Sequence, residues 1–175
     1  MRAKLAIFVV ALALTSSSAA DAPAEEYRVK GAFLLNFTKF VEWPAPAFKA
    51  PGDPILICVL GASPFTPALD QAAHELVVNN RQVTVRPIAD VQLAPRCQIV
   101  FVPVSERKRA RALLEAVRQE SVLTVGESDG FIASGGVVEF RVEDSKVRME
   151  ISAEAAKKSG LHVSAKLLSL SQSRK

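Results

Sequence analysis

Few side chains of this 175-residue chain are spaced for catalysis or metal binding. Its two histidines, His74 and His162, lie far apart in the sequence, and neither has a metal-ligand partner four residues away or at another known spacing. The segment 127–130 carries two carboxylates, but acidic residues in a glycine-containing loop usually serve turn formation. We find no nucleophile with a general base beside it. The pattern favours neither an enzyme nor a metal centre, and we expect no cofactor.

Two serines are candidates for a ligand-binding loop. Ser63 follows an apolar run at 55–60, Ser105 follows another at 98–102, and each lies near the start of an expected helix. Helix N-termini favour anions, and loops that follow neighbouring parallel strands can meet where the strand order reverses. The glycine spacing of a nucleotide-binding loop is missing around Ser63. Ser63 and Ser105 therefore indicate at most a site for a small ligand, with ordinary surface as the alternative.

The first 20 residues have the pattern of a secretory signal peptide. Arg2 and Lys4 precede ten apolar residues, and Ser18 and Ala20 supply the small side chains that precede a cleavage point. The apolar run is too short to cross a bilayer, which takes about 20 residues. We expect cleavage after Ala20, which leaves residues 21–175, a length typical of a single domain.

The charge of the exported chain argues against nucleic-acid binding. Arg2 and Lys4 are the only charged residues in the first 20, so the formal net charge falls from +4 to +2 after cleavage. Proteins that bind nucleic acids present a concentrated basic surface to the phosphates. We therefore expect no nucleic-acid partner.

Cys58 and Cys97 are the only cysteines of the chain. An exported protein folds in an oxidising compartment, where two cysteines are expected to form a disulfide, and the alternative is two buried free thiols. A redox-catalytic role is disfavoured because the Cys-x-x-Cys spacing is missing and Cys58 lies within an apolar run.

The elements that would position these residues alternate between strands and helices. Apolar or β-rich runs predict four strands, at 55–60, 82–86, 98–102 and 121–125. Helical periodicity predicts a helix over 64–76, closed by Asn79 and Asn80, and a second helix that begins at Ser105. This alternation is typical of an α/β domain with a mostly parallel central sheet flanked by helices. Right-handed crossovers would place the first strand between the second and the third, so the strand of Cys58 would adjoin the strand that Cys97 precedes.

The segment 27–44 predicts an amphipathic helix that ends before Pro44. Its charged residues exclude a membrane span. Six apolar residues form its buried stripe: Val29, Phe33, Leu34, Phe37, Phe40 and Val41. Four residues fall on the opposite face: Arg28, Thr38, Lys39 and Glu42. Leu35 lies on that charged side, so Leu35 and Lys39 are candidates for contact with a partner.

Alternating residues over 138–151 predict an antiparallel hairpin at the sheet edge, with a turn at 143–146. Five charged side chains are expected to point outward: Glu139, Arg141, Lys146, Arg148 and Glu150. They can pair across the two strands and leave one face to water or to a partner. Two short helices, capped by Ser152 and by Ser164, are expected to follow.

Several segments, taken together, resemble the YfiR-like family of periplasmic regulatory proteins. The matching segments are YRVKGAFLLNFTKFVEWP, ILICVLG with Cys58, PRCQIVFV with Cys97, LTVGESDGFIASGGVVEF, VRMEISAEAAKKSGL and SAKLLSL. They follow one another through most of residues 27–170, so the resemblance is to a whole domain.

This resemblance implies a periplasmic, non-enzymatic regulator. Such a protein would repress an inner-membrane diguanylate cyclase by binding its periplasmic region, and an outer-membrane lipoprotein would be a second partner. The resemblance also places Cys58 and Cys97 at the paired cysteine positions of the family. A second pair that some members carry is missing, because the segment 126–140 contains no cysteine.

We expect partner contacts on exposed side chains of the first helix, the hairpin and the C-terminal helix. The candidates are Leu35, Lys39, Arg141, Arg148, Glu150 and Leu168. For each of them, ordinary surface or core packing is the alternative. The edge hairpin and the aromatic helix also suit a homodimer. The alternative function is that of a periplasmic small-ligand-binding or sensor accessory protein, with Ser63 and Ser105 near the ligand.

Overall fold

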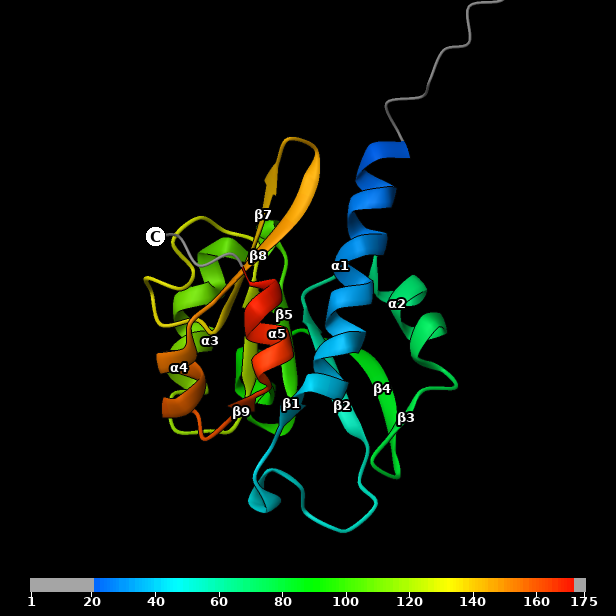
Figure 1. The fold of residues 1–175 in the computed structure, drawn as a ribbon, viewed down its shortest axis with the longest axis vertical. Coiled ribbons are helices and arrows are strands. Elements are labelled where there is room, and N and C mark those ends of the chain that lie inside the picture. Colours follow the sequence, from blue (N-terminus) through cyan, green and yellow to red (C-terminus); the bar gives the residue numbers. More distant parts are fainter. Residues whose placement is uncertain (1–20, 172–175) are drawn as a thin grey trace, which may run out of the picture.

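A mixed seven-stranded sheet forms the centre of the molecule (Figure 1). The computed structural model describes residues 21–171, so the signal peptide expected over 1–20 lies outside the described part. The strands, in the order in which they lie side by side, are β3 (Val77–Val78), β4 (Arg81–Ile88), β2 (Ile55–Leu60), β5 (Ile99–Val102), β6 (Leu123–Gly126), β7 (Val138–Glu143) and β8 (Lys146–Ile151). Strands β4, β2, β5, β6 and β7 are parallel, whereas β3 and β8 are antiparallel to their neighbours. The predicted fold class and the placement of β2 between β4 and β5 are confirmed.

Helices pack on both faces of the sheet. They are α1 (Asp21–Phe40), α2 (Thr66–Ala73), α3 (Ala110–Ala116), α4 (Ala153–Lys158) and α5 (Ala165–Leu170), with 3₁₀ helices η1 (Ala45–Ala47), η2 (Val91–Arg96) and η3 (Val104–Arg109). Side chains of α1, α2, α4 and α5 bury the larger apolar cluster on one face. Side chains of η2 and α3 bury the smaller cluster on the other face. Within the described residues, no helix is long and apolar enough to cross a bilayer.

Helix α1 is longer at its start and shorter at its end than the sequence predicts. It begins at Asp21, and after Phe40 the chain forms β1 (Val41–Glu42), which pairs with β9 (His162–Val163). The expected continuation to Trp43 is wrong because this pairing draws the backbone into an extended form. The indole Nε1 of Trp43 donates to the backbone oxygen of Gln98 over 3.0 Å, which fixes the chain after the helix.

The aromatic stripe of α1 is buried as predicted, but its polar face is narrower. Leu34 and Phe37 have no exposed surface. Thr38, expected on the polar face, is also buried, and its hydroxyl donates to the backbone oxygen of Leu35 over 2.6 Å. This local bond supplies the hydrogen-bond partner that the buried hydroxyl needs.

The residues expected to close the helix after β2 form a strand hairpin instead. Asn79 and Asn80 have φ values of 51° and 61° and connect β3 to β4. Two consecutive residues at positive φ form the tight turn whose twist suits adjacent antiparallel strands, and asparagine tolerates this conformation. The helix α2 therefore ends at Ala73, and the two residues of β3 cover the edge of β4.

The C-terminal elements follow the sequence prediction closely. Strands β7 and β8 form the expected edge hairpin, with Asp144 and Ser145 at positive φ in its turn. Ser152 Oγ accepts from the backbone N–H of Ala155 over 3.1 Å and caps α4. Ser164 Oγ caps α5 in the same way.

The helix expected from Ser105 differs from its prediction. It begins as the 3₁₀ helix η3 and becomes α-helical only at Ala110.

Candidate functional site

The disulfide expected between Cys58 and Cys97 is present in the structure. Cys58 lies within β2 and Cys97 directly precedes β5, and their Cα atoms are 6.0 Å apart. Because neither residue is more than 2% exposed, the bond lies within the smaller apolar cluster, where no reductant or substrate has access. Its position indicates a structural role.

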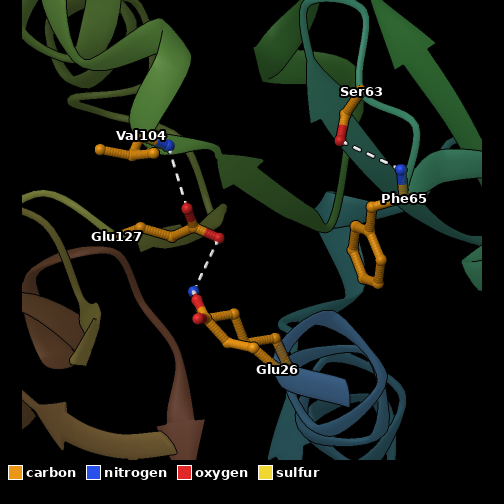
Figure 2. A network of polar contacts seen from close by, with 6 residues as sticks. Glu26, Ser63, Phe65, Val104 and Glu127 are labelled. Atoms are coloured by element: carbon orange, nitrogen blue, oxygen red, sulfur yellow. Dashed lines mark hydrogen bonds and ion pairs between the residues drawn. The ribbon is translucent and has the colours of Figure 1, made fainter. Parts of the chain in front are cut away.

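A buried ionic cluster joins α1 to the sheet. Lys30 and Glu127 have only 4% and 5% of their side-chain surface exposed, and Lys30 Nζ lies 3.1 Å from Glu127 Oε1. Lys30 also pairs with Glu26, one turn earlier on the helix. The other oxygen of Glu127 accepts from the backbone N–H of Val104 over 3.0 Å. Figure 2 shows the Glu127 carboxylate between Val104 and Glu26. The carboxylate thus connects α1, the start of η3 and the end of β6.

The same cluster perturbs the only tyrosine of the chain. Burial, followed by the negative charges of Glu127 and Glu26, raises the pKa of Tyr27 to about 12. The Tyr27 ring also stacks on Phe65, with 5.2 Å between ring centres, so it bridges α1 and the segment before α2. Tyr27 therefore remains neutral at physiological pH and acts as a packing residue.

A second polar network lies at the base of the hairpin. Glu139, expected to point outward, is completely buried, and the prediction of its exposure is wrong. Its carboxylate accepts from the backbone N–H of Ile132 over 3.1 Å and from Arg141 Nε over 2.8 Å. Arg141 Nη2 lies 3.2 Å from Glu150 Oε2 on the adjacent strand. The hydrogen bond that Arg141 donates to Glu139 is the main cause of the raised pKa of Arg141. Alternation along β7 correctly places Glu139 and Phe140 on opposite faces of the strand. The loop 128–136 covers the face on which Glu139 lies.

An open cleft of about 580 Å³ lies between these two networks. It is bounded by α1, by the loops that follow β5 and β6, and by the outer part of β7. Its lining residues are Glu26, Lys30, Val104, Glu127, Asp129, Phe140, Arg141, Val142 and Glu143. In Figure 1 the N-terminal half of α1 and the tip of the hairpin extend beyond the sheet in the same direction. The cleft thus lies at the carboxyl ends of parallel strands, where α/β proteins commonly bind their ligands.

The predicted partner residues fall into two separate groups. Arg141, Arg148 and Glu150 are half-buried on the paired strands of the hairpin, and Arg141 lies directly opposite Arg148. Leu35, expected on the charged face of α1, is half-buried against the core, whereas Lys39 is exposed.

The C-terminal candidate is only partly accessible. Leu168 in α5 is half-buried, and the exposed leucine of that helix is Leu170, at 58%. Helix α5 lies beside α1 in Figure 1. The roles of the six candidates in partner binding remain predictions.

The candidate ligand serines are not brought into one pocket. Ser63 lines a cleft of about 930 Å³ at the ends of β2 and β4, while Ser105 is exposed in η3. The Ser63 hydroxyl accepts from the backbone N–H of Phe65 over 3.3 Å (Figure 2). At the point where the strand order reverses, Glu106 packs so closely over Gly61 that a Cβ there would lie 2.2 Å from its carboxylate. The Glu106 side chain thus packs against Gly61, in the loop between β2 and Ser63.

Metal-ligating side chains do not gather into a site within residues 21–171. No group of three or more histidine, cysteine, aspartate or glutamate side chains could hold a metal ion there. His74 is exposed, and His162 Nδ1 lies 3.8 Å from Glu42 on the two-stranded ladder.

Sequence analysis missed Lys30, Glu127 and Glu139. The signal for Lys30 was its position seven residues, or two helical turns, before the fully buried Phe37, which places it on the buried side of α1. Glu127 directly follows a buried strand, where its side chain can meet the adjacent loops. For Glu139 there was no local signal, because its burial depends on a loop that folds over the strand.

Comparisons with known proteins give a family and a fold. The model of the family described as YfiR/HmsC-like matches residues 27–172. No curated protein matches the chain. A solved structure from Vibrio cholerae O1 biovar El Tor str. N16961, described as a conserved domain protein, has a TM-score of 0.54 and 13% sequence identity. The match covers 69% of this chain and 55% of that chain, so this protein corresponds to little more than half of it.

Proposed function

Because the chain belongs to the YfiR/HmsC-like family, we propose that it restrains an inner-membrane diguanylate cyclase by binding the periplasmic region of that enzyme. Members of this family are periplasmic regulators of cyclic di-GMP signalling, and the family is generally non-enzymatic. The protein acts after export, once its first 20 residues have been removed. An outer-membrane lipoprotein is the second proposed partner, which would sequester the regulator and release the cyclase.

The family match over residues 27–172 is the observation that carries this proposal. The surface at the hairpin supports it, because charged side chains there are held by ion pairs to their neighbours. Arg141, for example, is held by both Glu139 and Glu150. Preorganised charges of this kind reduce the entropy lost on binding and favour one partner over others.

The test is a deletion strain combined with a binding measurement. Deleting the gene should raise cellular cyclic di-GMP and biofilm, and restoring the gene should reverse both. A strain that also lacks the partner cyclase should show no rise, which serves as the control. The purified protein should bind the isolated periplasmic region of that cyclase. Unchanged cyclic di-GMP together with no binding would contradict the proposal.

A second candidate function is the binding of a small ligand in the cleft that Ser63 lines. The hydroxyl of Thr66, in a residue that is 8% exposed and lines this cleft, has no hydrogen-bond partner within the described residues. Buried hydroxyls usually have such a partner, so a bound molecule could supply it. Thermal-shift measurements with small carboxylates and phosphates test this function. A ligand-dependent rise in Tm that the Thr66→Val variant loses would support it, and no rise with any compound would refute it.

A further inference from the structure

The cleft between α1 and the hairpin contains more negative than positive charge. Four of its lining residues are carboxylates and two are cations. Both cations are already engaged: Lys30 contacts Glu26 and Glu127. Arg141 contacts Glu139 and Glu150. Glutamate side chains of the protein therefore neutralise both positive charges of the cleft.

Two carboxylates of this cleft have no cation of their own. Asp129 and Glu143 are exposed and form no ion pair within 4 Å among residues 21–171. Asp129 lies in the loop after β6, and Glu143 ends β7. Because carboxylates outnumber cations in the lining and both cations are paired, the net field of this cleft is negative, so it attracts cationic groups and repels anionic ones.

Apolar groups line the same cleft. Val104 and Val142 are 45% and 50% exposed, and they are among the few large hydrophobic side chains that the described surface leaves open. The buried ring of Phe140 also lines the cleft. On α1, Phe33 and Phe37 pack against this ring at centroid distances of 5.8 and 6.2 Å, so the inner wall of the cleft is part of the core. Apolar surface beside uncompensated charge is an arrangement that suits the anchoring residues of a protein interface.

We propose that this cleft binds a segment of the protein partner that presents a lysine or arginine between apolar side chains. The cationic group would lie between Asp129 and Glu143, and the flanking apolar side chains would cover Val104 and Val142. This inference rests on the proposed function for the identity of the partner as the cyclase. It adds the location of the contact and the chemistry of the segment that is recognised.

The first experiment reverses the unpaired charges. The variant Asp129→Lys/Glu143→Lys should bind the periplasmic region of the cyclase at least about tenfold more weakly and should fail to lower cyclic di-GMP in the deletion strain. The matched control Glu75→Lys/Glu120→Lys makes the same charge change at two exposed carboxylates outside the cleft and should bind within about twofold of the unaltered protein. The Tm of each variant verifies that it is folded.

The second experiment identifies the bound segment. A photo-crosslinking amino acid in place of Val142 should label a segment of the cyclase that contains lysine or arginine among apolar residues. The same amino acid in place of Val77, which is 57% exposed on β3 at the opposite edge of the sheet, should not label it. Labelling of an acidic segment, or equal labelling from both positions, would overturn the inference.

The outcomes separate this inference from the proposed function. Failure of the unaltered protein to bind the cyclase overturns both. If the unaltered protein binds and represses the cyclase and the charge-reversed variant does so equally well, only the inference about the cleft is overturned.

Discussion

The two faces of the central sheet are held together by different means. On one face, the Cys58–Cys97 disulfide joins β2 and β5 within an apolar cluster that lacks buried ion pairs. On the other face, the Lys30–Glu127 ion pair joins α1 to the carboxyl end of β6 beside an open cleft. Apolar burial stabilises the folded chain, and a disulfide, once formed in an oxidising compartment, adds stability by restricting the unfolded chain. A buried ion pair is a poor source of stability and holds charges in defined positions instead. Because the larger apolar cluster lies on the face of the ion pair, both faces stabilise the fold. The ionic face in addition holds charges in defined positions beside an open cleft, which suits it to recognition.

Removal of the disulfide tests this comparison most strongly. The variant Cys58→Ala/Cys97→Ala should lose about 4 kcal/mol of unfolding free energy. The disulfide joins residues 39 apart in the sequence, and without this cross-link the unfolded chain has more conformational entropy. Urea denaturation monitored by circular dichroism measures the change. Affinity for the partner under native conditions should stay within about twofold. A large loss of affinity in protein that is still folded would contradict the division between the two faces.

Removal of Lys30 should have the next largest effect on stability. The variant Lys30→Met leaves Glu127 buried without its cation and should cost about 3 kcal/mol. The double variant Lys30→Met/Glu127→Gln removes both charges and should regain much of that loss. The double-mutant cycle, measured by urea denaturation, gives the coupling energy of the pair. Additive effects of the two substitutions would show that the ion pair contributes nothing to the position of α1.

Glu139 and Glu150 provide a comparison within the hairpin. The variant Glu139→Ala leaves the backbone N–H of Ile132 and the guanidinium of Arg141 without their shared acceptor and should destabilise by about 2 kcal/mol. The variant Glu150→Ala removes a carboxylate that is 35% exposed and should cost less than about 1 kcal/mol. Equal losses in thermal unfolding would mean that the 128–136 loop does not depend on Glu139.

The titration of the Tyr27 phenol is a probe of the ionic face, and it does not affect the stability of the protein at neutral pH. Its folded pKa of about 12 is above the ordinary value of 10.0, so the contribution of the neutral phenol to stability is complete below pH 10 and declines as the pH rises toward 12. Because the chain has one tyrosine, absorbance at the phenolate band follows this group alone. The variant Glu127→Gln should lower the midpoint, since it removes a negative charge that opposes ionisation. An unperturbed midpoint in the unaltered protein would place Tyr27 in solvent.

The disulfide face could be predicted from sequence, whereas the ionic face could not. Apolar runs such as 55–60, together with handedness rules, were sufficient to place Cys58 next to Cys97. The helix caps at Ser152 and Ser164 depend on side chains three residues apart and were equally accessible. These features are local, or they follow from regular strand order.

The ionic face depends on contacts between residues that are distant in sequence. Lys30 meets Glu127 only after the whole sheet has formed, and Glu139 is buried by a loop that no periodic pattern describes. Similarly, the β1–β9 ladder that shortens α1 could not be found within α1 itself. Sequence patterns identify which residues lie on a given face of an element, but long-range contacts decide which of those faces is covered.

For a protein exported as proposed above, the β1–β9 ladder also bears on how the chain reaches its native state. Val41 pairs with Val163, and the backbone N–H of Ser164 donates to the backbone oxygen of Phe40 over 2.9 Å, so the chain at the end of α1 is completed by the segment before α5. An exported chain emerges from its translocation channel N-terminus first, which means that the phenylalanines of α1 arrive long before the strands and helix that bury them. Folding must therefore wait for release of nearly the entire chain, and until then α1 is a hydrophobic helix that a periplasmic chaperone would recognise.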